Sequence, residues 1–356
     1  MSGLAAQVEQ ARPARETLPA GRARLRPVWA LGALALLLAA IVCGVAFGPS
    51  GLPVSSVARE LLGLHSGLTQ LQSDIVWQIR LPRVALGVIV GGTLALAGSA
   101  YQGVFRNPLA DPYLLGVAAG AGLGATVAIA YGIRGHLASI DTLPLLAFAG
   151  ALAAVACTYL VGRSAGGSVA SLLLAGITVA AFCTALQTYI QQHHVDQLQL
   201  VYSFILGGLG GSDWGDVRLV GPYVGASTAL ILLSARKLDV LALGDVEAAS
   251  LGIDVRRVRL VVVLAATIGT AAVVAVSGLI GFVGIIVPHL LRLALGVGSP
   301  RVLLPLSLLV GGAFVVGCDL IARTIEAPAE LPIGVITAFI GAPFFAVVLR
   351  TSRGLT

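Results

Sequence analysis

The chain has 356 residues, of which 57% are hydrophobic and only 11% are charged. A soluble domain carries about 25% charged residues, so this composition excludes an ordinary soluble protein and indicates one surrounded mainly by lipid. The net charge of +6 is not gathered into a basic face with base-stacking aromatic residues. We therefore expect no nucleic acid partner.

The chain begins with a polar stretch that precedes the first apolar segment. Residues 1–26 contain prolines and arginines and are predicted to form a disordered, basic, cytoplasmic tail, followed by a single transmembrane domain over residues 27–353. The first apolar segment, Pro27–Phe47, exceeds the roughly 7–15 apolar residues of a cleaved signal peptide, and no A-x-A-type site closes it. It therefore predicts a membrane span.

Similar apolar segments recur along the chain. About 20 helical residues are needed to cross the ~30 Å hydrocarbon core of a bilayer. Segments near this length are Pro27–Phe47, Val84–Phe105, Pro112–Ile133, Thr142–Gly162, Val169–Gln191, Leu219–Ala235, Val302–Ile321 and Leu331–Leu349. Small residues four positions apart, as at Gly87 and Gly91, predict that these helices pack closely.

The uncharged stretch Leu260–Leu291 is longer than one membrane-spanning helix needs and shorter than two such helices would need. Glycines and Pro288 interrupt its second half. We predict one span that ends near Val276 and a shorter one from about Ile280 to Leu295. The chain is thus expected to be an all-α polytopic membrane protein with ten transmembrane helices.

The basic residues give the orientation of these spans. With the N-terminus inside, only six of the 22 lysine and arginine residues fall on the outer side of the membrane. They are Arg59, Arg80, Arg83, Arg134, Arg218 and Arg323. This bias satisfies the positive-inside rule, so both termini are expected in the cytoplasm.

The second span begins on the outer side with the sequence IRLPR, Ile79–Arg83. Arg80 and Arg83 lie one helical turn apart beside Pro82. The two arginines could anchor the helix to lipid headgroups. They could equally meet an acidic partner, because an outward basic pair runs against the orientation bias.

A cytoplasmic turn with the sequence GVFRNPLADPYLLG, Gly103–Gly116, joins the second and third spans. Asn107 and Asp111 each precede a proline, which disfavours the helical region for both residues and stiffens the turn. Asp111 is also a good N-cap for the following helix. A tight turn between two helices accounts for much of this pattern.

A short helix is predicted in a cytoplasmic loop, within the sequence LALGDVEAASLGI, Leu241–Ile253. Asp245 can cap it, Glu247 suits the positive end of its dipole, and Gly252 suits its end. A two-turn helix in a polar loop cannot bury itself. Its acidic centre would be repelled by anionic lipid, so we expect a groove on a partner protein to receive it.

Two further pairs of polar residues lie near the outer side. Asp319 is the only acid well inside an apolar run, and Arg323 follows one turn later, so an i,i+4 ion pair is the simplest interpretation. His193 and His194 lie at the outer end of the fifth span. They are either solvated loop residues or possible contacts for a substrate such as haem.

Two catalytic motifs are absent from the sequence. It contains no G-x-x-x-x-G-K-[ST] phosphate loop and no H-E-x-x-H. The four cysteines have no ligand spacing, so we expect neither a metal site nor a cofactor on this chain. An ion-coupled secondary carrier is the alternative from another class, although such carriers usually need several buried carboxylates. A membrane scaffold would leave the short cytoplasmic helix unexplained.

Taken together, these segments resemble the permease family of type II ABC importers for ferric siderophores, haem and cobalamin, from about Val76 to Arg353. The matching sequences are WQIRLPR, QGVFRNPLADPYLLG, SLLLAGI, LALGDVEAASLGI, GLIGFVGIIVPHLLR and ELPIGVITAFIGAPFF. The resemblance implies a homodimer with the translocation path on its two-fold axis. It also implies two ATP-binding cassette subunits, which carry ATP and magnesium, and a periplasmic substrate-binding protein on the outer side.

The resemblance also implies roles for individual residues. The coupling helix that enters the ATPase is expected to comprise Asp245, Glu247, Ala248, Leu251 and Gly252, and the arginines that receive glutamates of the binding protein are Arg80, Arg83 and Arg323. Asn107 and Leu109 match one layer of a cytoplasmic gate, and Val169 and Ala170 match a second. Ferric siderophores are the leading cargo. The outer segment Gly207–Trp214 looks closer to cobalamin permeases, and the two histidines leave haem open.

Overall fold

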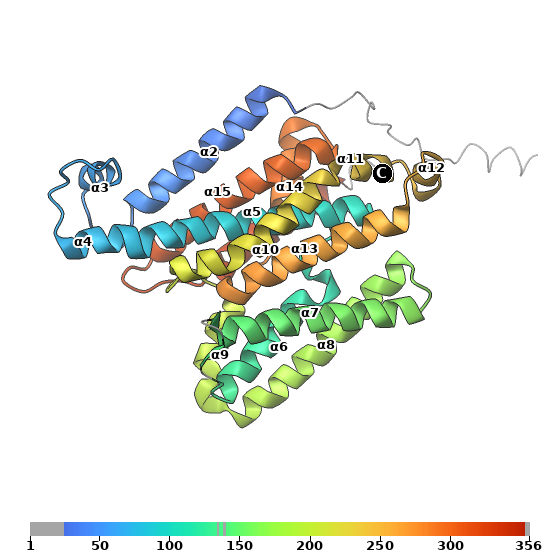
Figure 1. Ribbon diagram of the computed structural model, residues 1–356, viewed down its shortest axis with the longest axis horizontal. Helices are drawn as coiled ribbons and strands as arrows, with labels where there is room; N and C mark the ends of the chain where they lie inside the picture. Colours follow the sequence, from blue (N-terminus) through green and yellow to red (C-terminus); the bar gives the residue numbers. More distant parts are fainter. Residues whose placement is uncertain (1–24, 134, 138–139, 353–356) are drawn as a thin grey trace, which may run out of the picture.

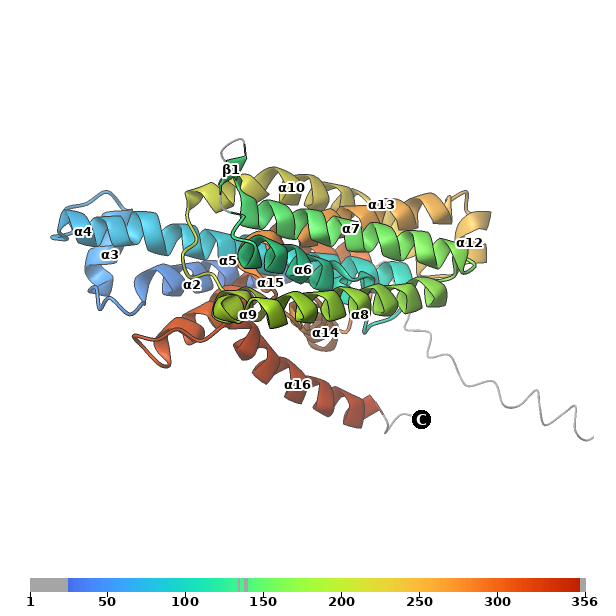
Figure 2. The ribbon, with the colours of Figure 1, turned by 90° about the horizontal axis from the view of Figure 1, so that it is seen from below.

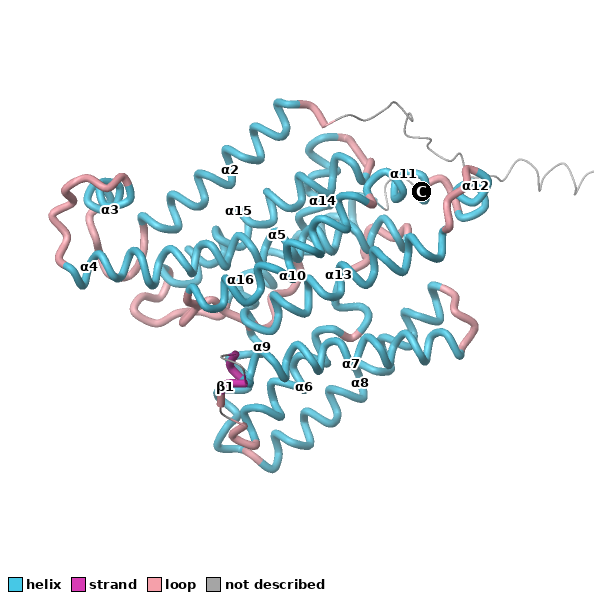
Figure 3. The backbone as a smooth tube through the Cα atoms, viewed as in Figure 1, coloured by secondary structure: helices cyan, strands magenta, loops and turns pink. Residues whose placement is uncertain are grey.

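The structure is a computed structural model that describes residues 25–133, 135–137 and 140–352. Residues 1–24 of the predicted tail, and Arg134, lie outside the described residues. Within the described residues the fold is almost entirely helical, as predicted (Figure 3). Two short strands there, β1 (His136–Leu137) and β2 (Ile140–Asp141), pair as an antiparallel hairpin.

Seven helices in the described part of the chain are long and apolar enough to cross a membrane. They are α2 (Pro27–Ala46), the continuous run of α4, η1 and α5 (Gln70–Phe105), α7 (Thr142–Ser164), α8 (Val169–His193), α10 (Trp214–Leu233), α13 (Val255–Ser277) and α15 (Pro300–Thr324). Further apolar helices coincide with the other predicted spans: α6 (Val117–Ala130), α14 (Val283–Leu295) and the stretch Ile333–Val348 of α16 (Ile333–Ser352). Every predicted span therefore falls on a helix, and the count of ten crossings stays a prediction.

Short elements connect these helices at the two ends of the bundle. They are α3 (Val54–Leu61), α4 (Gln70–Asp74), the π-helical η1 (Ile75–Arg80), the 3-10 helices η2 (Pro112–Leu115) and η3 (Val195–Gln197), α9 (Leu198–Leu206), α11 (Ala235–Leu241) and α12 (Asp245–Ser250). Figure 1 places α3 and α4 at one end and α12 at the other. Below we call these the α3–α4 end and the α12 end.

Two helices begin later than the predicted spans. The third span was expected from Pro112, but a 3-10 turn occupies its first residues, and α6 starts after Gly116, whose φ of +87° ends that turn. Likewise α14 starts after Phe282, which has a φ of +69°. A backbone in this left-handed region cannot continue a right-handed helix, so both helices are shorter than the apolar runs suggested.

α5 (Leu81–Phe105) is the central helix and packs against α15, α13, α14 and α10 (Figure 1). Glycine permits these contacts, since a Cβ atom on Gly91 would overlap the carbonyl oxygen of Gly311 on α15. A Cβ atom on Gly98 would overlap the carbonyl group of Gly284 on α14 in the same way. Backbones approach this closely in lipid because packing replaces the hydrophobic drive between helices. The predicted packing role of Gly91 is confirmed.

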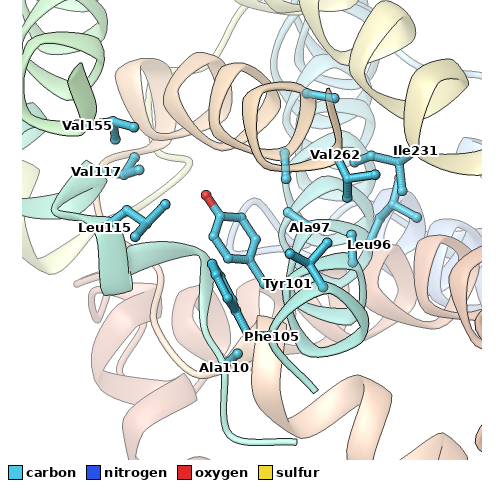
Figure 4. Packing of buried hydrophobic residues seen from close by; sticks show 14 of the residues in the cluster. Leu96, Ala97, Tyr101, Phe105, Ala110, Leu115, Val117, Val155, Ile231 and Val262 are labelled. Atoms are coloured by element: carbon cyan, nitrogen blue, oxygen red, sulfur yellow. The ribbon is translucent and has the colours of Figure 1, made fainter. Parts of the chain in front are cut away.

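α6, α7 and α8 form a second group of helices that packs beside the first (Figure 1). A buried hydrophobic cluster joins the two groups around Tyr101 of α5, with Leu115, Val117 and Val155 on one side of it (Figure 4). The Tyr101 hydroxyl is hydrogen-bonded to Oγ1 of Thr267 on α13 at 2.9 Å. This bond gives the buried Tyr101 hydroxyl a hydrogen-bond partner, which neither lipid nor the apolar core could provide.

α16 diverges from the rest of the bundle (Figure 2). Its first residues pack near α9, α14 and α15, and its later turns leave apolar side chains exposed, among them Phe339 and Val347. α8 is also apolar and largely exposed, since only 17% of its most apolar stretch is buried. An exposed apolar surface of this kind is stable only against lipid or another protein.

Candidate functional site

Arg83, at the α3–α4 end, is the centre of a buried group of charges. Its Nε and Nη2 atoms donate to Oδ1 of Asp319 on α15 at 3.0 and 2.8 Å. Its Nη1 and Nη2 atoms donate to Oε1 and Oε2 of Glu330 at 2.8 and 3.0 Å. The planar guanidinium thus binds two carboxylates at once, which is the geometry in which arginine pairs most strongly.

The other two predicted docking arginines lie beside this pair. Arg323 is 2% exposed, donates to the carbonyl oxygen of Gly44, and places Nε 3.4 Å from Oδ2 of Asp319. Arg80 donates to the carbonyl oxygen of Val45 at 2.8 Å, and also to the Ser50 hydroxyl. The predicted ion pair between Asp319 and Arg323 is confirmed. We call Arg80, Arg83, Asp319, Arg323 and Glu330 the arginine–carboxylate cluster.

Burial separates the possible roles of these arginines. Arg80 and Arg83 are only 3% and 7% exposed, so the interpretation that they anchor the helix to lipid headgroups is wrong. Their donors are taken up within the chain, because a charge without a partner is costly to bury. The docking role stays a prediction, and it requires the cluster to open.

α12, at the opposite end, is the short helix predicted in the 241–253 loop. It spans Asp245–Ser250, and Gly252 follows it with a φ of +78°, the conformation that suits a glycine stop. Its outer face exposes Val246 and Leu251 beside Glu247, whereas Ala248 is buried against the bundle. An exposed apolar pair flanking an acid on a two-turn helix fits contact with another protein.

Asp245 does not cap α12 as predicted, because Gly244 takes the N-cap position without a side-chain bond. The Asp245 carboxylate instead accepts hydrogen bonds from Arg106 at 3.0 Å and from Arg259 at 3.2 Å. Arg106 follows the end of α5, and Arg259 is in the second turn of α13. α12 is thereby tied to the gate turn and to a long helix at once.

The predicted gate turn has a fixed local geometry. Asn107 Oδ1 accepts the backbone N–H of Leu109 at 2.9 Å, so its side chain closes a turn across Pro108, and Leu109 is exposed. Asp111 Oδ1 accepts the N–H of Tyr113 at 2.7 Å, so Asp111 caps the 3-10 helix η2 and not the long helix α6 as predicted, because Gly116 takes the N-cap position of α6. Partial burial of the Asp111 carboxyl raises its pKa to about 6.

A cavity of about 260 Å³ adjoins the gate turn, and Arg106 and Asn107 are among the residues that line it. Arg292 of α14 also lines it and donates to Oε1 of Gln102 on α5 at 3.0 Å. Gln102 Nε2 donates to the carbonyl oxygen of Gly284 at 3.0 Å. This link could not be predicted from the sequence, because Gln102 and Arg292 are 190 residues apart and neither stands out in its own segment.

Val169 and Ala170, the second predicted gate layer, begin α8 after the N-cap residue Ser168. Ser168 Oγ accepts the N–H of Ser171 at 3.1 Å. The connection between α7 and α8 lies at the α12 end (Figure 1), so both predicted gate layers are at the same end of the molecule. Val169 is half-buried and Ala170 is exposed.

His193 and His194 end α8 on the opposite side of the molecule from α12. The His193 ring lies 4.5 Å from the ring of Tyr189 in its own helix, and the His194 ring lies 4.9 Å from that of Tyr131. The two imidazoles therefore contact different aromatic rings rather than converging on one point. A role in substrate contact stays a prediction.

Residues 36–351 match the model of the FecCD transport family. The chain is 38% identical over 339 residues to the hemin transport system permease protein HmuU of Yersinia pestis, covering 93% of this chain and 98% of that protein. It is 41% identical over 290 residues to the cobalamin import system permease protein BtuC of Halobacterium salinarum, covering 81% of this chain and 76% of that protein.

A solved structure shares the whole fold. It is described as a proposed metal-chelate type ABC transporter in an inward-facing conformation, and it superposes with a TM-score of 0.80 at 29% identity, covering 92% of this chain and 100% of that chain. Long apolar helices around α5, with a short exposed helix at one end, indicate a multi-pass membrane protein. The chain belongs to the FecCD transport family, since the family model matches most of its length. It is a permease subunit of an ABC importer rather than an enzyme.

Proposed function

We propose that this chain is the membrane-spanning half of an importer that carries a metal chelate from periplasm to cytoplasm, with ferric siderophores as the leading cargo. Two copies, each a single domain over residues 27–353 that crosses the inner membrane ten times, enclose the path. Both termini are cytoplasmic. Two ATP-binding cassette subunits, which hold ATP and magnesium, dock at the α12 end, and a periplasmic binding protein docks at the α3–α4 end.

The observation that carries this proposal is the placement of α12. It exposes Val246 and Leu251 to a partner, and Asp245 connects it to Arg106 beside the gate turn and to Arg259 of α13. A movement of the cassette subunits is thereby transmitted to the gate. The gate has an open and a closed state, and α12 makes different contacts with the ATP-bound cassette subunits in each. Such a difference is what allows ATP binding to shift the equilibrium between the two states of the gate.

The transport cycle follows from these connections. ATP binding closes the cassette subunits and moves the two α12 helices. The gate layers at Asn107 and Leu109, and at Val169 and Ala170, then change their arrangement, and the loaded binding protein releases cargo into the cavity between the two copies. Hydrolysis resets the gate. This chain contributes shape and switching, and the bond chemistry belongs to the cassette subunits.

Coupled transport in vesicles tests the role of α12. The full chain is reconstituted with its cassette subunits and binding protein, and Asp245→Asn is compared with the native protein. We expect ATP hydrolysis to continue while chelate uptake falls about tenfold or more, because α12 no longer holds Arg106 and Arg259. Asp196→Asn, on the opposite side of the molecule from α12, is the matched control and should transport normally. Normal coupled uptake by Asp245→Asn would contradict the role of α12.

The same vesicles distinguish the alternative, an ion-coupled secondary carrier. That carrier would move its substrate on an ion gradient without cassette subunits. The buried carboxylate Asp319 is paired with two arginines rather than free to take up an ion, which favours the ABC importer. Uptake by the isolated chain on a gradient alone would overturn the proposal.

The cargo is best identified from the absorption spectrum of the binding protein, because the permease cavity is expected to be wide and weakly selective. Copurified binding protein would show a ferric charge-transfer band with a siderophore, a corrin spectrum with cobalamin, or a Soret band with haem. The similarity to cobalamin and hemin permeases keeps both of these as alternatives, and His193 and His194 are the candidate contacts for haem.

A further inference from the structure

Glu330 differs from the other members of the arginine–carboxylate cluster in its exposure. It lies in the loop between α15 and α16, and its side chain is 38% exposed, whereas those of Arg83 and Asp319 are 9% and 1% exposed. It is therefore the member that solvent or a partner can reach. The hydrogen bonds from Arg83 lower the pKa of Glu330, so it is ionised at neutral pH.

Glu330 binds Arg83 in the way that a carboxylate ligand from outside the chain would bind it. Both of its carboxylate oxygens accept from the two terminal nitrogens of Arg83, at 2.8 and 3.0 Å. This bidentate arrangement is the one by which arginine recognises carboxylates in general. Any acidic side chain that arrived from outside would use the same two nitrogens.

The charge balance of the cluster favours a carboxylate at this position. Three arginines face two carboxylates, so the cluster has an excess positive charge even while Glu330 is in place. Arg80 has only carbonyl and hydroxyl acceptors among its hydrogen bonds in the described residues. Removing Glu330 without replacement would leave Arg83 short of a partner, and a buried arginine without a partner is unfavourable.

The loop that carries Glu330 also fixes the start of α16. The N–H of Leu331 donates to the carbonyl oxygen of Ala322 at 3.0 Å, and the N–H of Ile333 donates to that of Gly207 at 3.0 Å. Glu330 is adjacent to the first of these bonds. Its release from Arg83 would loosen the loop and the beginning of the helix that diverges from the bundle (Figure 2).

We propose that Arg83 is a carboxylate-binding site that Glu330 occupies within the free chain, and that an acidic side chain of the docking protein takes its place. The exchange keeps the guanidinium paired at each stage and frees the 325–332 loop. Docking on the outer side is thereby communicated to the first turn of α16. The identity of the docking protein as the periplasmic binding protein rests on the proposed function.

Binding measurements on the full chain, assembled with its cassette subunits in lipid nanodiscs, test the exchange. The affinity of the binding protein is measured for the native chain, for Glu330→Gln and for Glu326→Gln, at low and high salt. Glu326 is exposed in the same loop, so its substitution removes the same charge without touching Arg83. We expect Glu330→Gln to tighten docking on the order of tenfold at low salt, and Glu326→Gln to change it little.

Hydrogen exchange of the same samples gives a second readout. The amides of Leu331 and Ile333 should exchange faster in Glu330→Gln, and also in the native chain once the binding protein is docked. Unchanged exchange in both cases, or docking by Glu330→Gln equal to or weaker than that of the native chain, would overturn the proposal.

Arg83→Gln separates this proposal from the proposed function. If it weakens docking while Glu330→Gln leaves docking unchanged, the docking surface is correct and the exchange with Glu330 is wrong. If Arg83→Gln also leaves docking unchanged, the docking surface itself is wrong and the exchange falls with it.

Discussion

Asp319 holds the arginine–carboxylate cluster together, because Arg83 and Arg323 both pair with it inside the protein. Asp319→Asn would leave two buried guanidiniums short of a counter-charge. Breaking a buried ion pair on one side costs about 3–5 kcal/mol, so we expect a clear loss of thermal stability in detergent.

The surface pair of Asp239 and Arg301 provides the control for this measurement. Their side chains are 20% and 51% exposed, and a pair of this kind contributes roughly 0–1 kcal/mol. Asp239→Asn should therefore shift the midpoint of thermal unfolding much less than Asp319→Asn. Equal shifts would mean that the cluster contributes no more than a surface ion pair.

Asp111 predicts a dependence of stability on pH. Burial raises the pKa of its carboxyl from the usual 3.8 to about 6. The folded chain therefore binds the proton more tightly than the unfolded chain, and this residue's contribution to the free energy of unfolding falls as the pH rises from about 4 through 6. We expect a lower thermal midpoint at pH 7.5 than at pH 5.

Asp111→Asn tests that assignment, since the amide keeps the acceptor for the N–H of Tyr113 but does not titrate. Its stability should change less between pH 5 and pH 7.5 than that of the native chain. The same slope in both proteins would assign the pH dependence to other groups.

At the scale of helices, the crossing of α5 and α14 depends on Gly98. A Cβ atom there would overlap the backbone of Gly284, so Gly98→Ala must push the two helices apart. Overpacking of this kind costs typically 1–3 kcal/mol, and we expect a lower thermal midpoint and reduced transport. Gly32→Ala in α2 is the matched control, because nothing lies within 4 Å of its Cβ position. Equal stability of the two variants would contradict the close contact.

The helices could largely be predicted from the sequence, because apolar runs about as long as a bilayer is thick leave few alternatives. The late starts of α6 and α14 could not be predicted, since they depend on the backbone conformation at Gly116 and Phe282. Glycine at a turn is a recognisable signal, but a phenylalanine with positive φ is not.

The candidate site was predictable to a different extent at each end. The α12 helix is local, so its acids, its glycine stop and its position between basic clusters already marked it. The cluster at the other end is not local, because Arg83 and Glu330 are 247 residues apart. A single sequence identified the arginines and predicted the pair of Asp319 and Arg323, but it gave no indication that Asp319 and Glu330 both bind Arg83.

The whole molecule has its two candidate sites at opposite ends, and α5 runs between them. Arg83 lies in its first turn and Arg106 directly follows its last. At 1.5 Å per residue, a helix of 25 residues spans about 37 Å. Since α5 is also the helix that α10, α13, α14 and α15 pack against, a displacement at either end is transmitted as a movement of one rigid element. This arrangement suits the proposed permease, which binds a partner protein at each end of the molecule.

The exposed face of α16 predicts how two copies of the chain assemble. Phe339 is 74% exposed on a helix that diverges from its own bundle (Figure 2), so we expect a second copy to cover it. Phe339→Ser should raise the fraction of monomer in native mass spectra of the complex purified without cassette subunits. Leu31→Ser is the control, because Leu31 is similarly exposed, at 65%, on α2, where lipid is its expected neighbour. An unchanged monomer fraction in Phe339→Ser, or an equal rise in both variants, would place the contact between copies on another face.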